Sequence, residues 1–415
     1  MMRPSRQNII GIVGLGYVGL SLVKSLFERN FIVIGYDTDE NKVEKIRRGH
    51  SPNETIEDSE LVVINSSGRF YTTTEAKELA KAEVVIVAVP TPLTAMGNPD
   101  LSLLERACVE IAPHIKSETL LINESTSYPG TLRDFIVPLI KQNQGDGNSK
   151  IYFACSPERV NPGDVFYSHG KTPRVVSGLD DSARERVHAF YSEFVDDVFV
   201  ASTPEVAEMS KLLENSFRLV NISFINEISD YCVSQGIPVR EVIQAASTKP
   251  FGFMPFLPGP GVGGHCIPVD PAYLLQDAAD KGKALPLLKK ALQSNRSRSS
   301  QITSFLKTEL GSLKGKKVLI EGVTYKPNVA DTRETPAEPL FESLMAEGAQ
   351  VHWHDSLVQN WNNSESSRVS DNKWEITLVL VLHEDSDVSE LIRHSEIIFD
   401  FTGKLPMESG RVRLI

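Results

Sequence analysis

The chain of 415 residues has few cysteines and no pair of them at metal-binding spacing. Its four cysteines lie far apart, and none belongs to a Cys-x-x-Cys motif; they are Cys108, Cys155, Cys232 and Cys266. A disulfide framework and a structural zinc site are therefore disfavoured, and a reducing compartment fits this pattern better.

Long hydrophobic runs and an excess of positive charge are also absent from the sequence. No apolar run approaches the ~20 residues that span a bilayer, and the N-terminal residues lead into a short apolar strand without a signal-peptide core. The formal net charge is −11 at pH 7, which argues against nucleic acid but leaves room for a small phosphorylated ligand held by a few cations. We expect a cytoplasmic protein with no membrane partner and no nucleic-acid partner.

The N-terminal residues follow the order of a dinucleotide-binding unit. An apolar strand at 8–13 leads into the glycine loop Gly14–Gly19, a helical segment, and a second apolar run that ends at Asp37. The first glycine of such a loop permits the turn, the second lets the backbone approach a pyrophosphate, and the third lets the helix pack on the strand. Asp37 would accept hydrogen bonds from the ribose hydroxyls and repel a 2′-phosphate. The complete unit therefore favours NAD over NADP, and over a chance glycine turn.

Three further apolar strands each end in a loop rich in Pro, Gly, Ser or Thr; they lie at 84–89, 119–123 and 151–155. The ligand of an open parallel sheet lies where such carboxyl-end loops gather, so we expect Thr91, Thr126 and Glu158 to converge near the nicotinamide. Taken singly, each could be only a turn residue. We assign residues 1–200 to an NAD-binding Rossmann domain.

From Pro204 the chain runs to Cys232 without glycine or proline, which predicts a long helix capped by Thr203. Three polar residues share one of its faces at i, i+4 and i+7 spacing: Lys211, Asn215 and Arg218. On most helices this would be a solvated stripe. Because this helix is apolar over more than one stripe, a substrate cleft is the better interpretation. We assign residues 201–310 to a central helical domain.

After residue 310 the alternation of strands and helices returns and predicts a second, smaller doubly wound sheet. The expected elements are strands at 318–324, 350–354, 376–382 and 397–401, a helix at 337–346 and a polar surface loop at 359–373. We assign residues 311–415 to a second, Rossmann-like domain. The predicted fold class is α/β, with two Rossmann-like doubly wound parallel-sheet domains joined by a long central helix and a helical middle region.

The loop Gly259–Pro271 contains four glycines and three prolines, so it is neither regular helix nor regular strand. It carries Cys266, with His265 beside it and Asp270 four residues on, which is one way to present a reactive thiolate. A tight loop whose cysteine merely packs explains this stretch equally well. A metal site is disfavoured because these three residues have no partner cluster elsewhere.

Seven motifs, in this order, resemble the UDP-glucose/GDP-mannose dehydrogenase family of NAD-dependent enzymes, which oxidise the C6 alcohol of a nucleotide sugar to a carboxylate. The resemblance covers nearly the whole chain. Its motifs are GxGxxG at Gly14–Gly19, VPTP at Val89–Pro92, EST…PGT at Glu124–Thr131, SPERV at Ser156–Val160, KLLEN at Lys211–Asn215, GVGGHCIPVDP at Gly261–Pro271 and TYK…DTRE…P at Thr324–Pro336. It implies NAD as the cofactor, a UDP-sugar as the substrate and a role in polysaccharide biosynthesis. It also implies that residues 201–310 are the dimerisation domain of a homodimer built on the central helix, and that residues 311–415 bind the UDP-sugar.

The resemblance also implies a four-electron oxidation in which Cys266 forms a thiohemiacetal and then a thioester. Catalytic roles fall on Cys266, Lys211, Asn215, Asp270, Glu158 and Thr126. Cofactor binding falls on Gly14, Gly16, Tyr17, Val18, Gly19, Asp37, Lys42, Pro90, Thr91, Thr126 and Arg333. Substrate binding falls on Glu158, Arg159, Val160, Lys211, Asn215, Arg218, Phe256, Gly259, Gly263 and Lys326.

Two departures from the UDP-glucose pattern look like the subgroup that acts on UDP-N-acetylmannosamine or UDP-N-acetylglucosamine. The SPE motif is followed by 159–162, Arg-Val-Asn-Pro, where the UDP-glucose enzymes have Phe-Leu-Arg-Glu, and His265 stands where they have Ser or Tyr. Because Pro162 replaces a glutamate, the base that activates the hydrolytic water stays open. Three alternatives also remain: a UDP-glucose 6-dehydrogenase, a two-electron hydroxyacid or polyol dehydrogenase that uses no thiol, and a nucleotide-binding sensor without activity.

Overall fold

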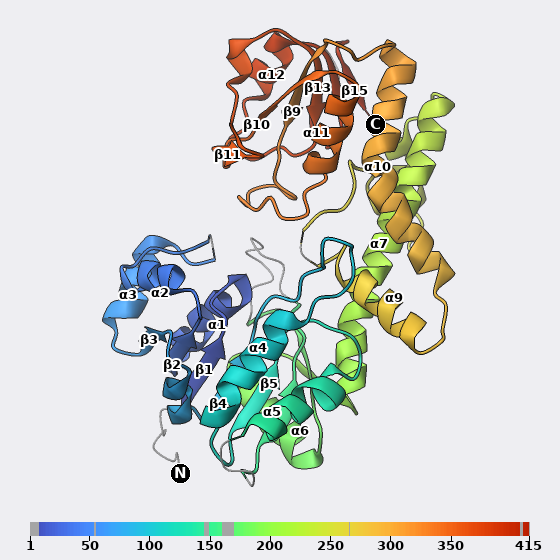
Figure 1. Ribbon diagram of the computed structural model, residues 1–415. Coiled ribbons are helices and arrows are strands. Elements are labelled where there is room, and N and C mark those ends of the chain that lie inside the picture. The colour runs from blue at the N-terminus through green and yellow to red at the C-terminus, as the bar shows by residue number, and fades with distance from the viewer. Residues whose placement is uncertain are drawn as a thin grey trace. The chain divides into compact units, whose positions relative to one another are not determined.

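The computed structural model describes residues 8–53, 55–144, 149–159, 170–264, 266–406 and 410–414. The chain divides into two compact units, one made of residues 1–214 with 276–281 and the other of residues 215–275 with 282–415. Each unit has its own sheet, mainly parallel in the first and parallel in the second (Figure 1). Two helices contribute residues to both units: α7 (Pro204–Ser234) and α9 (Asp270–Asp280).

In the part of the chain that the structure describes, the sheet of the first unit has eight strands. Their order across the sheet is β3 (Phe70–Thr73), β2 (Ile32–Tyr36), β1 (Ile9–Val13), β4 (Val84–Val87), β5 (Leu120–Asn123), β6 (Tyr152–Cys155), β7 (Arg174–Gly178) and β8 (Val198–Val200). Neighbouring strands pair in parallel, except that β7 runs antiparallel to β6. The chain direction across the sheet reverses between β1 and β4, which is where a doubly wound sheet binds its ligand.

Helices cover both faces of this sheet, and this explains why its central strands are apolar throughout. Successive side chains of a strand point to opposite faces. Ile10, Ile86 and Ile122 therefore join a core with α1 (Tyr17–Glu28), α3 (Asp58–Ser66) and α6 (Asp181–Tyr191). The alternate strand residues join a second core with α4 (Ser102–Ile111), the π-helical turn η3 (Thr131–Ile136) and α5 (Val137–Asn143). The short elements α2 (Glu40–Arg47), η1 (Ala76–Lys81) and η2 (Ala112–His114) complete this unit.

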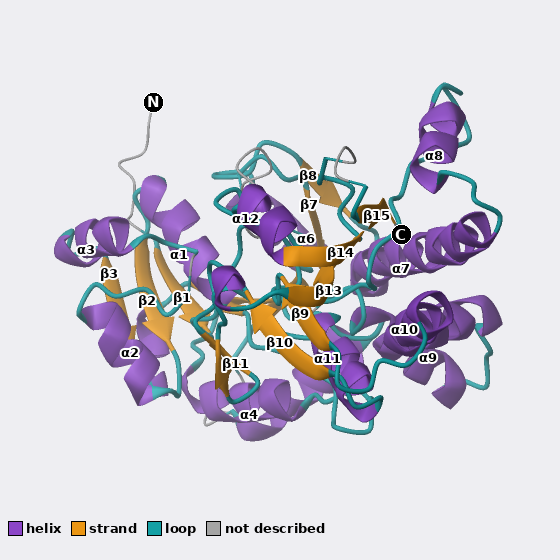
Figure 2. Ribbon diagram, turned by 90° about the horizontal axis from the view of Figure 1, so that it is seen from above, coloured by secondary structure: helices purple, strands orange, loops and turns teal. Residues whose placement is uncertain are grey.

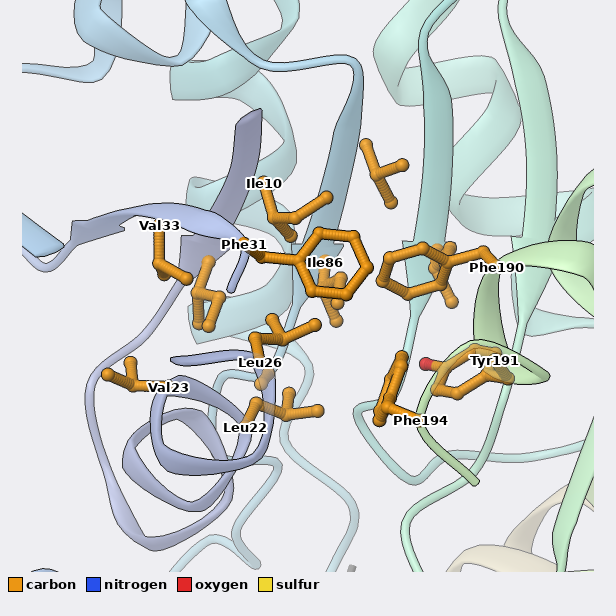
Figure 3. Packing of buried hydrophobic residues seen from close by; sticks show 14 of the residues in the cluster. Ile10, Leu22, Val23, Leu26, Phe31, Val33, Ile86, Phe190, Tyr191 and Phe194 are labelled. Carbon is orange, nitrogen blue, oxygen red and sulfur yellow. The ribbon is translucent and has the colours of Figure 1, made fainter. Parts of the chain in front are cut away.

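An aromatic cluster closes the first of these cores. Phe31 lies with Phe190, Tyr191 and Phe194 beside the apolar face of α1, as Figure 3 shows. The ring centroids of Phe31 and Phe190 are 6.1 Å apart, and those of Phe190 and Phe194 are 5.3 Å apart, both in edge-to-face geometry. This packing fixes the end of α6, and with it Tyr191.

In the described residues, the second unit has a five-stranded parallel sheet. Its order is β10 (Gln350–His354), β9 (Lys317–Glu321), β13 (Trp374–Val379), β14 (Ser395–Asp400) and β15 (Val412–Leu414). One face packs against α10 (Pro286–Leu310) and α11 (Ala337–Ala346), and the other against α12 (Val388–His394). Within this unit α10 runs alongside the C-terminal part of α7 (Figures 1 and 2), where Ser223 Oγ donates to the carbonyl oxygen of Ala291 at 2.9 Å. The second unit also contains helix α8 (Val239–Ser247).

The predicted fold class is confirmed, and several boundaries agree closely. The long helix begins at Pro204, where the Val206 N–H donates to Thr203 Oγ1 at 3.4 Å. Four strands of the two main sheets had no counterpart in the sequence analysis: β3, β7, β8 and β15. The stretch 359–373, expected as a loop, contains the hairpin β11 (Asn360–Trp361) and β12 (Ser364–Glu365) and the turn η4 (Val369–Asp371). Among the described residues, none of the helices combines the length and apolarity that crossing a bilayer requires.

Candidate functional site

The glycine loop after β1 has three glycines in three different environments. Gly14 has φ of +96°, and a Cβ there would lie 2.7 Å from the Ala88 carbonyl oxygen. Gly19 presses against the backbone of Gly14, so it admits no side chain. Around Gly16, by contrast, no protein atom lies within 4 Å of where a Cβ would be. Gly16, Tyr17 and Val18 thus form the open start of α1, where backbone N–H groups can meet a phosphate.

Asp37, directly after β2, is held by the same loop. Its Oδ2 accepts hydrogen bonds from the Leu15 N–H and from Lys42 Nζ, both at 2.8 Å, and its Oδ1 accepts from the Asp39 N–H at 3.0 Å. A carboxylate has about four acceptor positions, so three donors leave room for one more. The side chain is 9% exposed. This geometry ties the acid after β2 to the turn after β1.

The loops after β4 and β5 are joined through one serine. Ser125 Oγ accepts from the Val89 N–H at 3.0 Å and donates to the Val89 carbonyl oxygen at 2.8 Å. Thr91 is buried, Pro90 is exposed and Thr126 is half-buried. The structure therefore brings the segments of Thr91 and Thr126 together at the carboxyl edge of the first sheet.

Glu158 lies at the same edge, in a buried cluster of charged groups. Arg174 Nη2 donates to Glu158 Oε2 at 2.8 Å, and both Arg174 Nη atoms approach Glu124 Oε2, at 3.3 and 3.4 Å. The Tyr191 hydroxyl donates to Glu124 Oε1. Burial raises the pKa of Glu124 to about 8. The attraction of Arg174 opposes this shift, and the repulsion by Glu158 adds to it. Burial and the charge of Glu124 raise the pKa of Tyr191 as well.

Arg159 and the first turns of α7 complete the first unit's part of the site. Arg159 binds both carboxylate oxygens of Glu214, through Nη2 at 2.6 Å and Nε at 3.1 Å. Glu208 accepts the N–H groups of Gly130 and Leu132, at 2.6 and 2.9 Å, which fastens α7 to the turn η3. Lys211 is 7% exposed and belongs to this unit. Val160, expected to bind substrate, lies outside the described residues.

In the second unit, the loop that carries Cys266 is fastened by three neighbouring segments. The Gly259 N–H donates to Asn226 Oδ1 of α7 at 2.9 Å, and Val262 exchanges two hydrogen bonds with the Asn295 amide of α10. The Gly264 N–H donates to the Arg333 carbonyl oxygen at 3.2 Å. A Cβ on Gly263 would lie 2.5 Å from the Glu334 carbonyl oxygen, so only glycine fits there.

Cys266 is exposed and lies one turn before α9. Its carbonyl oxygen accepts the Asp270 N–H, the first of that helix, at 2.9 Å. Asp270 is buried, and its Oδ2 accepts from Asn215 Nδ2 at 2.5 Å. The structure thus brings together Asn215 and Asp270, two of the predicted catalytic residues. His265 lies outside the described residues.

The other cysteines have a different environment. Burial raises the pKa of the Cys108 thiol to about 12 and also raises that of Cys155, and the Cys232 side chain is buried. None of the four cysteines, all in the described part of the chain, belongs to a disulfide. A thiol in apolar surroundings is a poor nucleophile, so Cys266 is the cysteine whose placement permits covalent chemistry. No group of three or more His, Cys, Asp or Glu side chains that could hold a metal ion is found among the described residues.

Four further predicted binding residues lie in the second unit. Lys326 follows β9 and lies 5.8 Å from the centre of the Tyr325 ring. The guanidinium of Arg333 forms a bidentate pair with Asp331, with its shortest contact at 2.6 Å. Arg218 is exposed, and Phe256 packs edge-to-face on Phe217 with centroids 5.8 Å apart. The stripe predicted on α7 therefore has two buried members, Lys211 and Asn215, and one exposed member.

Comparison with known proteins matches the chain to three domains of one family along its length. The NAD binding domain of the UDP-glucose/GDP-mannose dehydrogenase family matches residues 8–195, the central domain residues 205–297, and the UDP binding domain residues 319–404. The chain belongs to this family. It is an NAD-dependent nucleotide-sugar dehydrogenase, and the predicted family, enzyme class and cofactor are confirmed.

Relatives with names that state a substrate are similar over most of their length. The UDP-N-acetyl-D-mannosamine dehydrogenase of Methanocaldococcus jannaschii is 35% identical over 374 residues, 87% of this chain and 83% of its own. The UDP-N-acetyl-D-glucosamine 6-dehydrogenase of Pseudomonas aeruginosa is 34% identical over 356 residues, 84% and 83% of the two chains. The solved UDP-D-ManNAc dehydrogenase of Pyrococcus horikoshii has a TM-score of 0.87 at 29% identity, covering 98% and 99% of the two chains.

Three residues of the buried cluster were given no role by the sequence analysis, although Glu124 opens one of the family motifs: Glu124, Arg174 and Tyr191. A signal existed for two of them. Glu124 comes directly after a buried strand, and Arg174 is a lone charge in front of an apolar run, Val-Val-Ser-Gly. Nothing in the sequence near Tyr191 indicates that its hydroxyl reaches a carboxyl group from the end of a helix.

Proposed function

We propose that this chain oxidises the C6 alcohol of a UDP-N-acetylhexosamine, either UDP-N-acetylmannosamine or UDP-N-acetylglucosamine, to the uronic acid with two NAD molecules used in turn. The names of its similar relatives support this substrate class. The observation that carries the proposal is Cys266, an exposed thiol next to the N-terminus of a helix in a loop fastened from three sides. The positive end of a helix dipole stabilises an anion such as a thiolate.

The proposed chemistry balances four electrons over two hydride transfers. The C6 hydroxyl loses its proton to a base and its carbon loses a hydride, which gives an aldehyde. NAD, when bound, accepts each hydride. The Cys266 thiolate then adds to the aldehyde carbon as a thiohemiacetal, and a second hydride loss leaves a thioester, which water hydrolyses to the carboxylate and the free thiol.

Each polar residue has a defined part in this scheme. Lys211 and Asn215 stabilise the oxyanion that develops at C6. Asp270 and Glu158 move protons, and Thr126 holds a water molecule. The hydrogen bond between Asn215 and Asp270 supports a joint role, because it fixes the orientation of the amide relative to the carboxylate.

For NAD we propose a site on the carboxyl edge of the first sheet. The pyrophosphate would lie on the N-terminus of α1 over Gly16, where no protein atom occupies the position of a Cβ. Asp37 would use its remaining acceptor position for a ribose hydroxyl, beside Lys42. Arg333 would contact the cofactor only after it leaves Asp331, so its contribution is expected to be small.

The UDP moiety would bind in the second unit, where Lys326 supplies positive charge to the diphosphate. Arg218 and Arg159 would contribute further cations, and Phe256 an apolar face. The proposal keeps the three-part organisation expected from the sequence: 1–200 for NAD, 201–310 for dimerisation and 311–415 for UDP-sugar.

A homodimer is supported by an apolar face along α7. Four large side chains on this helix are exposed by between 44% and 61%: Leu213, Phe217, Phe224 and Tyr231. Their spacing of four, seven and seven residues places them on one side of the helix. Such a stripe on one chain is typical of a helix that packs against a second copy. We also propose a cytoplasmic location, where UDP-sugars and NAD are available, and a role in polysaccharide biosynthesis.

The test is the ratio of NADH formed to sugar consumed by the purified protein with UDP-N-acetylmannosamine, UDP-N-acetylglucosamine and UDP-glucose. The proposal predicts about two NADH per hexosamine, as four electrons require. One NADH per substrate would mean a two-electron dehydrogenase. Preference for UDP-glucose would establish the alternative 6-dehydrogenase and overturn the hexosamine assignment.

A further inference from the structure

The loop after β9 in the second unit is held by residues that follow the two neighbouring strands. In the sheet, β9 lies between β10 and β13. Asp355 directly follows β10, and His383 lies in the segment that follows β13. Both of these side chains are buried, whereas in the loop Lys326 is half-buried and Asn328 is exposed. The outer part of the loop therefore rests on a buried support.

Asp355 holds the beginning of the loop. Its Oδ2 accepts the N–H groups of Val323 and Thr324, at 2.8 and 3.3 Å, and its Oδ1 lies 3.1 Å from His383 Nε2. The hydroxyl of Thr324 in turn donates to the Lys326 carbonyl oxygen at 3.1 Å. The backbone on the N-terminal side of Lys326 is thus fixed to the neighbouring strand.

His383 and Glu384 hold the end of the loop at Asn328. The Asn328 N–H donates to His383 Nδ1 at 2.9 Å. The Asn328 side chain makes two more hydrogen bonds: its Oδ1 accepts the Glu384 N–H at 3.0 Å, and its Nδ2 donates to Glu384 Oε1 at 3.1 Å. Asn328 has a φ of +60°, in the left-handed region that Asn adopts more readily than most residues. These three bonds keep it there.

One tautomer of His383 serves both ends of the loop. A backbone N–H can only donate, so Nδ1 carries no proton, and the neutral ring then has its proton on Nε2 and donates it to Asp355. The ring therefore connects Asp355 with Asn328. Between these anchors, Pro327 has a fixed φ and disfavours helical backbone at Lys326. Holding Asn328 consequently restricts Lys326 as well.

We propose that His383 is a positioning residue for the UDP moiety, because it holds the loop 323–328 so that Lys326 meets the diphosphate. The match to the UDP binding domain of the family, residues 319–404, includes the whole of this arrangement. The inference rests on the proposed function in one respect, the contact of Lys326 with the diphosphate. The buried His383 does not contact the ligand in this proposal. It reduces the freedom that Lys326 would otherwise lose when UDP binds.

Two substitutions separate the two hydrogen bonds of His383. His383→Asn places an amide oxygen where Nδ1 lies, so it can still accept the Asn328 N–H. His383→Gln places an amide nitrogen near the position of Nε2, so it can keep the bond to Asp355 but loses the bond to Asn328. We expect the affinity for UDP alone, measured by calorimetry, to stay within about threefold of the wild type in His383→Asn and to fall about tenfold in His383→Gln.

The matched control is His394→Gln. His394 is a histidine of α12 in the same domain, and its Nδ1 lies 3.2 Å from the Asn372 carbonyl oxygen. This variant should bind UDP as the wild type does. Unchanged UDP affinity in His383→Gln, or equal losses in His383→Asn and His383→Gln, would overturn the proposal.

A double substitution tests whether His383 acts through Lys326. Lys326→Gln alone should weaken UDP binding, and adding His383→Gln should weaken it no further, because the cation that the loop positions is gone. Additive losses would contradict the proposal. In steady-state kinetics, His383→Gln should raise the KM for the UDP-sugar about tenfold and keep kcat within about threefold, as expected for binding that is equal in the ground and transition states. A lower kcat at unchanged KM would also contradict it.

Hydrogen exchange of the Asn328 N–H, followed by mass spectrometry of the peptide that contains it, examines the loop without any ligand. Exchange should be faster in His383→Gln than in the wild type and in His383→Asn. If UDP binds but exchange is equal in all three proteins, this inference fails and the proposed function stands. If UDP does not bind to the wild type, the proposed function fails, and the exchange result still decides whether His383 holds the loop.

Discussion

The two units use the same backbone arrangement at the point where each sheet reverses direction. In the first, Gly14 follows β1 at φ +96°, its N–H donates to the Tyr36 carbonyl oxygen at 2.8 Å, and Asp37 accepts from the Leu15 N–H. In the second, Gly322 follows β9 at φ +82°, and its N–H donates to the His354 carbonyl oxygen at 2.9 Å. There Asp355 accepts from Val323 and Thr324, at 2.8 and 3.3 Å.

The difference lies in what else each aspartate binds. Asp37 pairs with the partly exposed Lys42, whereas Asp355 pairs with His383, which is 1% exposed, through Nε2 at 3.1 Å. His383 Nδ1 accepts the Asn328 N–H, so Nε2 carries the proton and donates to Asp355. The first aspartate keeps one acceptor position, which we propose for a ribose hydroxyl, while the second supports the loop that carries Lys326. The same backbone turn therefore has different side-chain partners in the two units, and the proposed ligands differ accordingly.

The largest effect is expected from removing the glycine of each turn. Gly14→Ala and Gly322→Ala each place a Cβ against a carbonyl oxygen, of Ala88 and Val381 respectively, at a φ that side chains rarely adopt. We expect each substitution to lower the free energy of unfolding of its unit by about 2–4 kcal/mol. Chemical denaturation measures this, with Gly68→Ala, near which no atom lies within 4 Å of the added Cβ, as the control for φ alone. If Gly68→Ala lowered the free energy of unfolding as much as the other two variants do, the close contact with a carbonyl oxygen would not be the cause of the loss.

A smaller and more selective effect is expected from the two aspartates. Asp355→Asn should cost about 1–3 kcal/mol of stability, because it weakens the buried bonds to His383 and two backbone N–H groups, and it should leave NAD affinity unchanged. Asp37→Asn should weaken NAD binding about tenfold. Calorimetric binding of NAD to both variants separates these effects. A loss of NAD affinity in Asp355→Asn alone would reverse the roles assigned here.

Stability should respond to pH in opposite directions through residues of the two units. Burial raises the pKa of Glu208 to about 7, so its folded form holds a proton that the unfolded chain has released, and stability is lost as the pH rises through 7. Although burial alone would raise it, the bonds from His383 and the Leu357 N–H hold the pKa of Asp355 below its ordinary value. Its contribution is lost as the pH falls through that lowered value.

Denaturation of Glu208→Gln and Asp355→Asn between pH 3 and pH 9 checks these signs. Glu208→Gln should remove a loss of about 1–3 kcal/mol that the wild type shows as the pH rises from about 4.5 to about 7, and Asp355→Asn should remove a loss at the acid end of the range. If the wild type and Glu208→Gln had the same pH dependence between pH 4.5 and pH 7, the raised pKa of Glu208 would be wrong.

Several features of the fold could be predicted from the sequence because their signals were local. The turn at Gly14, the acid at Asp37 and the long helix from Pro204 each follow from neighbouring residues. The cluster of Glu124, Arg174 and Tyr191 could not be predicted, because it joins a loop, a strand and a helix end that only the tertiary fold brings together. Strand β7 was missed for a related reason. Its stability comes from pairing with β6 and β8, and a short run that starts with Arg174 has little intrinsic strand signal.

The central claim is that Cys266 bonds covalently to the substrate carbon, and intact-mass analysis of acid-quenched single turnovers tests it most directly. With NAD and UDP-N-acetylmannosamine or UDP-N-acetylglucosamine, the wild type should show a sugar-nucleotide adduct on the peptide that contains Cys266. Cys266→Ser should show no adduct and lose turnover by about three orders of magnitude or more, while Cys155→Ser, at a buried thiol, should keep the adduct. Full turnover to the acid, with two NADH per sugar, by Cys266→Ser would contradict the covalent route.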